Sequence, residues 1–275
     1  MTLRSLNIGR SMRVPLAITL TLLTVVLPLA AQTRYAGPRT ADGKPDLNGI
    51  WQAMNTADWD LLPHAAAQGP VLALGAAGAQ PPGLGVVEGD EIPYLPAAAA
   101  KKKLNGAHWL TEDPEVKCFL PGVPRATYMP YPFQIVQTPG NVLIAYQFAS
   151  AVRSIPLKAR PGESPADSWM GDSYGHWEGD TLVVDVKGFT DNTWFSRAGD
   201  FHSDELHVVE RYIPLSHDAI QYEATIEDPQ TFSRPWKISM PLYRHLEKNA
   251  QLLEFKCVEF VEELMYGPLR KQSSK

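Results

Sequence analysis

A tight turn stands out in the stretch Gly175-His176-Trp177-Glu178-Gly179-Asp180-Thr181-Leu182-Val183-Val184-Asp185. A polar turn with a glycine separates an aromatic stem from an alternating β-branched run, and this pattern is typical of a β-hairpin. The surrounding region, 167–211, holds three tryptophans, three histidines and ten carboxylates. We therefore expect this region to organise both the fold and the site.

The period of two continues on both sides of this hairpin. Apolar and polar residues alternate in 133–137 and 142–148, which flank a Pro139-Gly140 pair suited to a turn with positive φ. A short helix is expected at 96–106. Further strands are expected at 151–155, 206–213, 219–226, 236–242 and 252–258. The chain thus predicts an all-β antiparallel meander.

A meander of about eight strands must close or stack to protect its edges. The Gly49-Ile50-Trp51 stretch resembles the first strand of lipocalins, where the tryptophan plugs one end of the barrel. We expect a lipocalin-like barrel with room for one small ligand, and a β-sandwich is the alternative. Arg211 could pack across one barrel end, as an arginine does against that tryptophan in lipocalins.

The first 31 residues have the three-part layout of a secretory signal peptide. Three arginines precede an apolar run from Val14 to Leu29, and the run ends in Ala30-Ala31. We expect cleavage near Ala31 and an exported protein, periplasmic or extracellular. A membrane anchor is the alternative, but it needs about 20 apolar residues, and two prolines interrupt this shorter run.

The expected mature chain is an irregular arm at 32–48 followed by one barrel-like domain at 49–275, with a Gly-, Ala- and Pro-rich excursion at 65–95. Losing three of the 25 basic residues leaves 22 against 30 acidic ones, a net charge of −8. Such an acidic chain disfavours nucleic acid and anionic lipid. We expect a small-molecule ligand as partner, no nucleic acid and no stable membrane insertion after cleavage. The oligomeric state stays open.

Glu210 is expected to face the core, because Val208 and Tyr212 share its face of the strand. A buried carboxylate must be paired or hydrogen-bonded, since an isolated buried charge is costly. Glu210 is therefore a candidate acid/base or ligand-binding group. The alternative is a structural ion pair with Arg153 or Arg125.

His202 is the second candidate for proton transfer, with Asp200 or Glu205 as the neighbour that orients it. Histidine exchanges protons near neutral pH, and a nearby carboxylate raises its pKa. Together with Glu210, these residues would make the chain an acid/base enzyme, a hydrolase, lyase or isomerase. A solvated loop histidine is the alternative reading.

The loop at 188–206 is too long for a plain connection and is expected to act as a lid over a binding site. Concave sites usually combine apolar walls with a few polar groups. The ligand-binding candidates are Trp194, Phe195, Tyr146, His176, Arg125, Arg153 and Arg211. The aromatic side chains of this loop and its surroundings suit a small apolar or aromatic molecule. A carbohydrate- or protein-binding module that uses exposed Trp194 and Trp169 is a further alternative.

Metal and cofactor motifs are absent from the sequence. It contains no His-x-His, Cys-x-x-Cys or His-Glu-x-x-His spacing, and no glycine-rich phosphate loop. We therefore expect no metal and no cofactor. Cys118 and Cys257 are a disulfide candidate in an oxidising compartment, or two separate buried thiols.

The chain also resembles a widespread, uncharacterised family of exported bacterial proteins. The resemblance is carried by Thr40–Trp51, Gly122–Arg125, Tyr131–Pro139, Trp177–Asp185, His202-Ser203, Glu210-Arg211 and Asp228-Pro229. It covers most of the mature chain and implies export. It implies no activity, because fold and family do not by themselves define function.

Overall fold

The structure is a computed structural model that describes residue 2 and residues 35–256. The chain divides into two units, Met1–Thr33 and Arg34–Lys275, and the fold below is that of the second. Apart from residue 2, the expected signal peptide lies outside the described residues, as does Cys257. Within the described part of the chain, no helix is long and apolar enough to cross a membrane.

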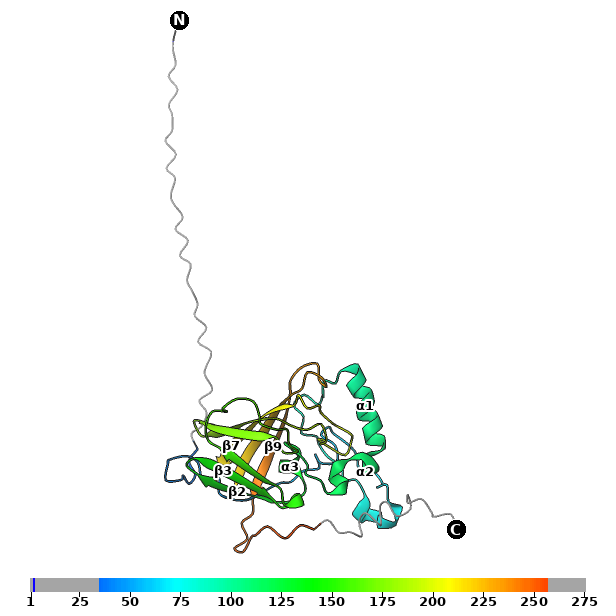
Figure 1. Ribbon diagram of the computed structural model, residues 1–275, viewed down its shortest axis with the longest axis horizontal. Helices are drawn as coiled ribbons and strands as arrows, with labels where there is room; N and C mark the ends of the chain where they lie inside the picture. Colours follow the sequence, from blue (N-terminus) through cyan, green and yellow to red (C-terminus); the bar gives the residue numbers. More distant parts are fainter. Residues whose placement is uncertain (1, 3–34, 257–275) are drawn as a thin grey trace, which may run out of the picture. The chain divides into compact units, whose positions relative to one another are not determined.

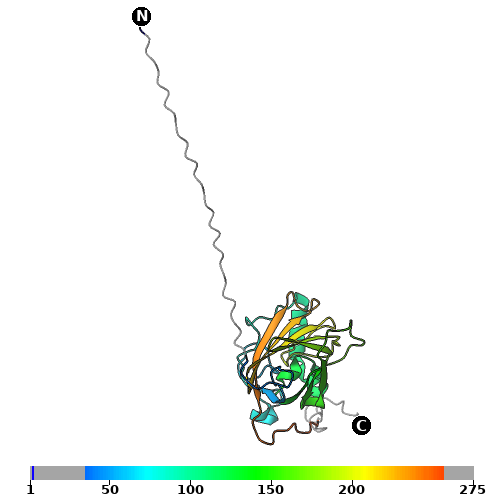
Figure 2. The ribbon, with the colours of Figure 1, turned by 90° about the vertical axis from the view of Figure 1, so that its left-hand side faces the viewer.

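One antiparallel sheet of nine strands forms the core of the described chain, in the order β4-β3-β2-β1-β9-β8-β7-β6-β5 (Figure 1, Figure 2). The strands are β1 (Gly49–Ala53), β2 (Phe133–Thr138), β3 (Asn141–Tyr146), β4 (Val152–Pro156), β5 (Asp172–Glu178), β6 (Thr181–Lys187), β7 (His207–Ser216), β8 (Ala219–Glu227) and β9 (Trp236–Arg244). Because β9 pairs with β1, the meander returns to its start. The all-β, barrel-like prediction is confirmed, and the single sheet is not a sandwich.

The two edge strands, β4 and β5, approach each other and nearly close the barrel. Gly175 on β5 makes this approach possible. A Cβ at this position would lie 3.0 Å from Ile155 Cγ2 and 3.0 Å from Leu157 Cδ2. Since a side chain here would push the two edges apart, the glycine belongs to the closure of the barrel.

The predicted hairpins form, but their glycines have different roles. Gly179 adopts φ +61° in the β5–β6 turn, in the left-handed region that glycine enters without strain. Gly140, in the β2–β3 turn, does not have a positive φ, contrary to the expectation for the Pro139-Gly140 pair. A turn with Pro at its second position also forms without positive φ, so the pair alone did not specify the turn type.

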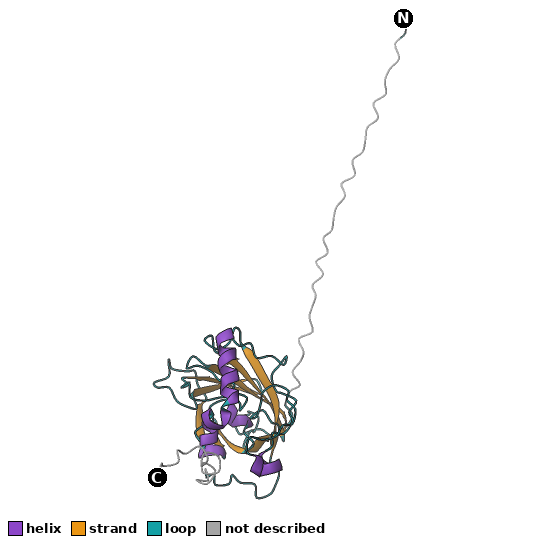
Figure 3. Cartoon of the chain, turned by 90° about the vertical axis from the view of Figure 1, so that its right-hand side faces the viewer, coloured by secondary structure: helices purple, strands orange, loops and turns teal. Residues whose placement is uncertain are grey.

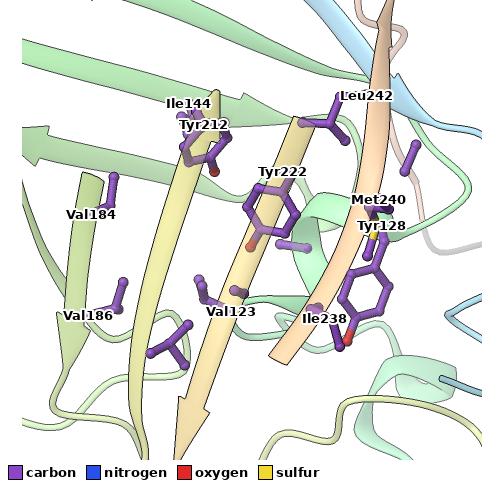
Figure 4. Packing of buried hydrophobic residues seen from close by; sticks show 14 of the residues in the cluster. Val123, Tyr128, Ile144, Val184, Val186, Tyr212, Tyr222, Ile238, Met240 and Leu242 are labelled. Atoms are coloured by element: carbon purple, nitrogen blue, oxygen red, sulfur yellow. The ribbon is translucent and has the colours of Figure 1, made fainter. Parts of the chain in front are cut away.

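Alternate residues of every strand point into the barrel and pack against one another. Figure 4 shows Tyr212 and Tyr222 on neighbouring strands beside Val184, Ile238 and Met240. These side chains are all 2% exposed or less. The barrel interior is therefore a side-chain core built by β-strand alternation.

Trp51 of β1 lies at one end of the barrel. The guanidinium of Arg244 packs over its ring, 4.2 Å from the ring centroid. The arginine that packs on the first-strand tryptophan therefore comes from β9. The expectation for Arg211 is wrong, because Arg211 pairs with Glu178 at 2.9 Å on the outer face. Arg244 also donates to the Asn48 carbonyl, and any side chain on Gly49 would collide with it.

α1 and α2 lie beside the strands (Figure 1), with α1 running across them (Figure 3), whereas α3 is buried and contacts β1. Their bounds are α1 (Pro96–Ala107), α2 (Trp109–Glu112) and α3 (Arg125–Tyr128), with short 3-10 helices η1 (Leu72–Gly78), η2 (Pro114–Lys117) and η3 (Phe148–Ser150). The expected helix at 96–106 is confirmed as α1.

A final strand at 252–258 is not formed in the part that is described, 252–256. The preceding strand, β9, already pairs with β8 on one edge and with β1 on the other. The segment therefore has no free edge of β9 to pair with, although its apolar residues alternate. Phe255 packs instead on Phe148 and Tyr131, with ring centroids 4.8 and 5.7 Å away.

Candidate binding site

A buried arginine is the centre of the candidate site. Arg125 begins α3 and donates from Nε to Asp58 Oδ1 at 2.9 Å. Its two terminal nitrogens donate to the two oxygens of Asp113, each at 2.9 Å. Glu115 Oε2 lies 3.5 Å from Nη2. This bidentate geometry with charged partners fixes the guanidinium plane.

Asp113 connects this ion pair to the local backbone. Its Oδ1 accepts the backbone N–H of Glu115 at 3.0 Å and so caps η2. The cap holds Glu115 on the same side of the turn as Asp113. The Asp113-Pro114-Glu115 sequence thus presents two carboxylates to the same guanidinium.

Arg197 comes from the loop at 188–206 and meets Glu115 from the other side. Its Nε donates to Oε2 at 3.0 Å, and Nη2 donates to Oε1 at 3.2 Å. The guanidinium lies 4.4 Å from the ring centroid of Trp59 and 5.1 Å from that of Trp109. Cation–π contact with two indoles therefore holds Arg197 in place.

A pocket of about 340 Å³ opens beside the Glu115–Arg197 pair. Its walls are mostly apolar or aromatic, and its charged members are Glu115, Arg197 and Lys256. The lining residues are Trp59, Pro70, Val71, Leu74, Ala77, Gly78, Trp109, Leu110, Glu115, Val116, Cys118, Tyr131, Phe148, Arg197, Phe255 and Lys256. Apolar walls with a few placed polar groups are typical of small-molecule sites.

The charges in this cluster do not balance. Three carboxylates, Asp58, Asp113 and Glu115, face two guanidiniums, Arg125 and Arg197. Asp58 Oδ2 is buried and makes no hydrogen bond, although it lies 3.6 Å from Arg197 Nε. Burial first, and the charge of Asp58 second, raise the pKa of Glu115 above its usual range.

For the two arginines, the neighbouring charges favour the charged form of the side chain. Burial alone would lower the pKa of Arg125, but Asp113, Asp58 and Glu115 outweigh it and raise the pKa well above its usual value. Burial also opposes the charge on Arg197, and the charges of Glu115 and Asp58 raise its pKa. Both guanidiniums therefore stay charged, and the cluster has one excess negative charge when all three carboxylates are ionised.

Glu210 is buried as predicted, and its partner is Arg153 rather than Arg125. Arg153 Nη2 lies 2.5 Å from Oε2, and Nη1 lies 3.2 Å from Oε1. The hydroxyls of Tyr222 and Tyr212 donate to Oε1 at 2.8 and 3.2 Å. Tyr146 Oη accepts from Arg153 Nη1 at 3.2 Å. The barrel core thus contains a hydrogen-bonded ion pair.

His202 is buried in the core. Its Nδ1 lies 2.7 Å from the Ser203 carbonyl, which can only accept, so Nδ1 carries the hydrogen. Nε2 then accepts from the Thr193 hydroxyl at 2.6 Å. Burial lowers the pKa of His202, so the ring stays neutral near pH 7. Both ring nitrogens are used by these contacts.

Asp200 does not orient His202 through its side chain. It accepts from Ser196 Oγ at 2.5 Å and from Tyr94 Oη at 2.8 Å, with Lys102 Nζ at 3.8 Å. Glu210 and His202 also bond to different groups among the described residues. The three expected acid/base residues therefore belong to three separate hydrogen-bond networks.

The loop at 188–206 is packed rather than open. Phe195 is 1% exposed and meets Trp236 edge-to-face at 5.8 Å. Trp194 is half-buried, and its backbone forms an isolated antiparallel β-bridge with Phe201. Neither Trp194 nor Phe195 lines the pocket, and the loop contributes Arg197 to it.

The remaining expected residues lie elsewhere. His176 is exposed on the outer face of β5, with Nε2 3.2 Å from Glu178 Oε1. Trp169 is half-buried and stacks on Phe119 at 5.1 Å. Cys118 is disulfide-bonded and lines the pocket. Because Cys257 is not among the described residues, the Cys118–Cys257 pairing stays a prediction.

Sequence reasoning found Arg125 but missed Asp58, Glu115, Arg197 and the two indoles that hold Arg197. No short motif joins these residues, since they come from three distant segments. The available signals were a carboxylate repeated around Pro114 and an arginine inside the expected functional loop. Neither signal identifies a partner.

Within residues 35–256, no three His, Cys, Asp or Glu side chains are arranged to hold a metal ion. The carboxylates of the cluster surround arginines instead. Comparisons of the chain with protein-family models, curated proteins and solved structures found no match.

Proposed function

We propose that this is an exported protein that binds a small apolar or aromatic molecule in the pocket beside Glu115 and Arg197. The observation that carries the proposal is the pocket itself, about 340 Å³ in volume and walled by aromatic and aliphatic side chains over a buried ion pair. Pockets that hold small ligands have this size and composition.

The ligand site in this proposal lies beside the barrel and not inside it. The inward side chains of the barrel pack against one another, while the pocket is lined by loops and short helices. The proton-transfer alternative placed on His202 and Glu210 has less support, because both side chains are buried and use separate partners.

The neutral fluorophore N-phenyl-1-naphthylamine tests the proposal, because its emission rises when it leaves water for an apolar site. Ala77 lines the pocket on exposed η1, so Ala77→Trp should fill the pocket without disturbing the core. Ala73→Trp is the matched control, on the same helix but outside the lining. We expect Ala77→Trp to weaken binding about tenfold or more and Ala73→Trp to bind like wild type.

The proposal would be wrong if the wild-type protein did not enhance the emission. It would also be wrong if Ala77→Trp and Ala73→Trp bound the fluorophore equally well.

A further inference from the structure

The pocket lining has charged groups, Glu115, Arg197 and Lys256, as well as an apolar surface. Its only acidic lining residue, Glu115, belongs to a cluster with one more carboxylate than guanidiniums in the described chain. Lys256, the lysine in the lining, is largely exposed and lies 3.2 Å from Glu254. Its charge is therefore shared with a surface carboxylate and does not neutralise the buried cluster.

A second feature of the pocket is its set of aromatic faces. Tyr131, Phe148 and Phe255 form a triad with ring centroids 5.5, 5.7 and 4.8 Å apart. Trp59 and Trp109 stand on the Arg197 side. Aromatic faces attract organic cations, and the attraction is strongest where water is excluded.

Arg197 shows that this environment already holds one cation. Its guanidinium lies against two indoles and bonds to Glu115, and it still leaves Asp58 Oδ2 without a hydrogen bond. A ligand anion would meet a cluster that is already negative. A ligand cation would restore neutrality and meet aromatic faces.

We propose that the pocket selects an organic cation, an ammonium or quaternary ammonium group carried on an apolar or aromatic body. This inference rests on the proposed function, and it adds the charge of the ligand. Glu115 provides the electrostatic attraction, and the aromatic triad provides the contact surface.

Three probes of matched shape test the sign of the charge: 4-phenylbutylammonium, 4-phenylbutan-1-ol and 4-phenylbutanoate. Isothermal titration calorimetry on the whole protein gives the dissociation constant of each. We expect the ammonium to bind about tenfold more tightly than the alcohol, and the carboxylate to bind most weakly. If the alcohol or the carboxylate equals or exceeds the ammonium, the charge inference fails while the proposed function stands. If none of the three binds, the charge inference fails, and the fluorophore titration decides separately whether the proposed function stands.

Glu115→Gln isolates the carboxylate, and it should abolish the preference for the ammonium while the alcohol still binds. Glu112→Gln is the matched control, because Glu112 is an exposed carboxylate on α2 outside the pocket lining. A preference that survives Glu115→Gln, or that Glu112→Gln removes equally, would contradict the assignment.

Phe255→Leu keeps a large apolar side chain and removes one ring, in a segment outside any helix or strand. It tests the aromatic contribution even if Glu115→Gln does not fold. We expect the affinity for the ammonium to fall several-fold and that for the alcohol to change little. Equal losses for both probes would contradict the cation–π contribution.

The wild-type protein provides a further test by pH. The charged groups that act on Glu115 are Asp58, Arg197, Arg125 and Asp113. Protonation of Glu115, whose pKa burial and Asp58 raise, removes one negative charge. The ammonium preference should therefore shrink as the pH falls through that pKa, while the alcohol affinity stays constant. A constant ratio of the two affinities would contradict the role of Glu115.

Discussion

Glu210 and Arg153 neutralise each other inside the barrel. Each is 4% exposed or less, and two tyrosine hydroxyls complete the coordination of the carboxylate. Removing one member leaves the other as an uncompensated buried charge, whereas replacing both with apolar residues removes the desolvation cost too.

Glu210→Gln should therefore destabilise the fold by about 3–5 kcal/mol, and the double variant Arg153→Met with Glu210→Leu should recover much of that loss. Urea denaturation of the purified variants measures both. Glu178→Gln is the matched control, since its pair with Arg211 is exposed and should contribute little. A double variant less stable than Glu210→Gln would show that the pair has a net stabilising value.

His202 should make the free energy of unfolding decrease as the pH falls. Its pKa is lowered in the folded state by burial, while in the unfolded chain it is about 6.5. Below about pH 6.5 the unfolded state takes up the proton first, so stability is lost as the pH falls toward the lowered folded pKa.

His202→Gln should flatten this dependence, and denaturation midpoints between about pH 7.5 and about pH 5.5 measure it. Because the comparison is with wild type, the opposite contribution from the raised pKa of Glu115 cancels. His217→Gln, at a half-exposed site, should keep the wild-type profile. Identical profiles for His202→Gln and wild type would contradict this role.

Among the elements, β4 and β5 meet at a seam between the two edges of the sheet, and this seam depends on glycine, which has no side chain, at position 175. A Cβ at Gly175 would lie 3.0 Å from both Ile155 Cγ2 and Leu157 Cδ2, closer than ordinary contact, and the two strands are the edges of the sheet. A branched side chain there must displace the neighbouring edge or adopt a poor rotamer.

Gly175→Val should destabilise the protein by about 1–3 kcal/mol in thermal or urea denaturation. Gly140→Ala is the matched control, because a Cβ at that turn position meets no atom within 4 Å. Equal stability of Gly175→Val and wild type would mean that the seam opens without cost.

For the molecule as a whole, the sheet is continuous everywhere except at this seam. β8 pairs along nearly all of its length with both β7 and β9, while β4 and β5 each pair on one edge only. Local opening is easiest where few backbone hydrogen bonds must break.

Hydrogen exchange followed by mass spectrometry should therefore show the fastest strand exchange in β4 and β5, and the slowest in β8. Peptides from β8 serve as the internal control. Protection of β4 and β5 equal to that of β8 would mean that the seam is hydrogen-bonded in solution and the barrel is fully closed.

The alternation of apolar residues was enough to predict the all-β class and the inward direction of Glu210, the turn residues completed the prediction of the hairpins, and residues typical of helix ends predicted α1. These properties are local, since the side-chain period of a strand is two whatever the strand pairs with. The segment at 252–256 shows the limit, because alternation does not report whether a sheet edge is free.

The sequence by itself determined which side chains enter the core and that Glu210 needs a partner. Only the tertiary structure decided that the partner is Arg153, that Arg244 packs on Trp51, and that the pocket lies beside the barrel. The physical reason is distance along the chain. Asp58, Glu115 and Arg197 come from three separate segments, and their meeting depends on how those segments pack against the barrel rather than on any local pattern.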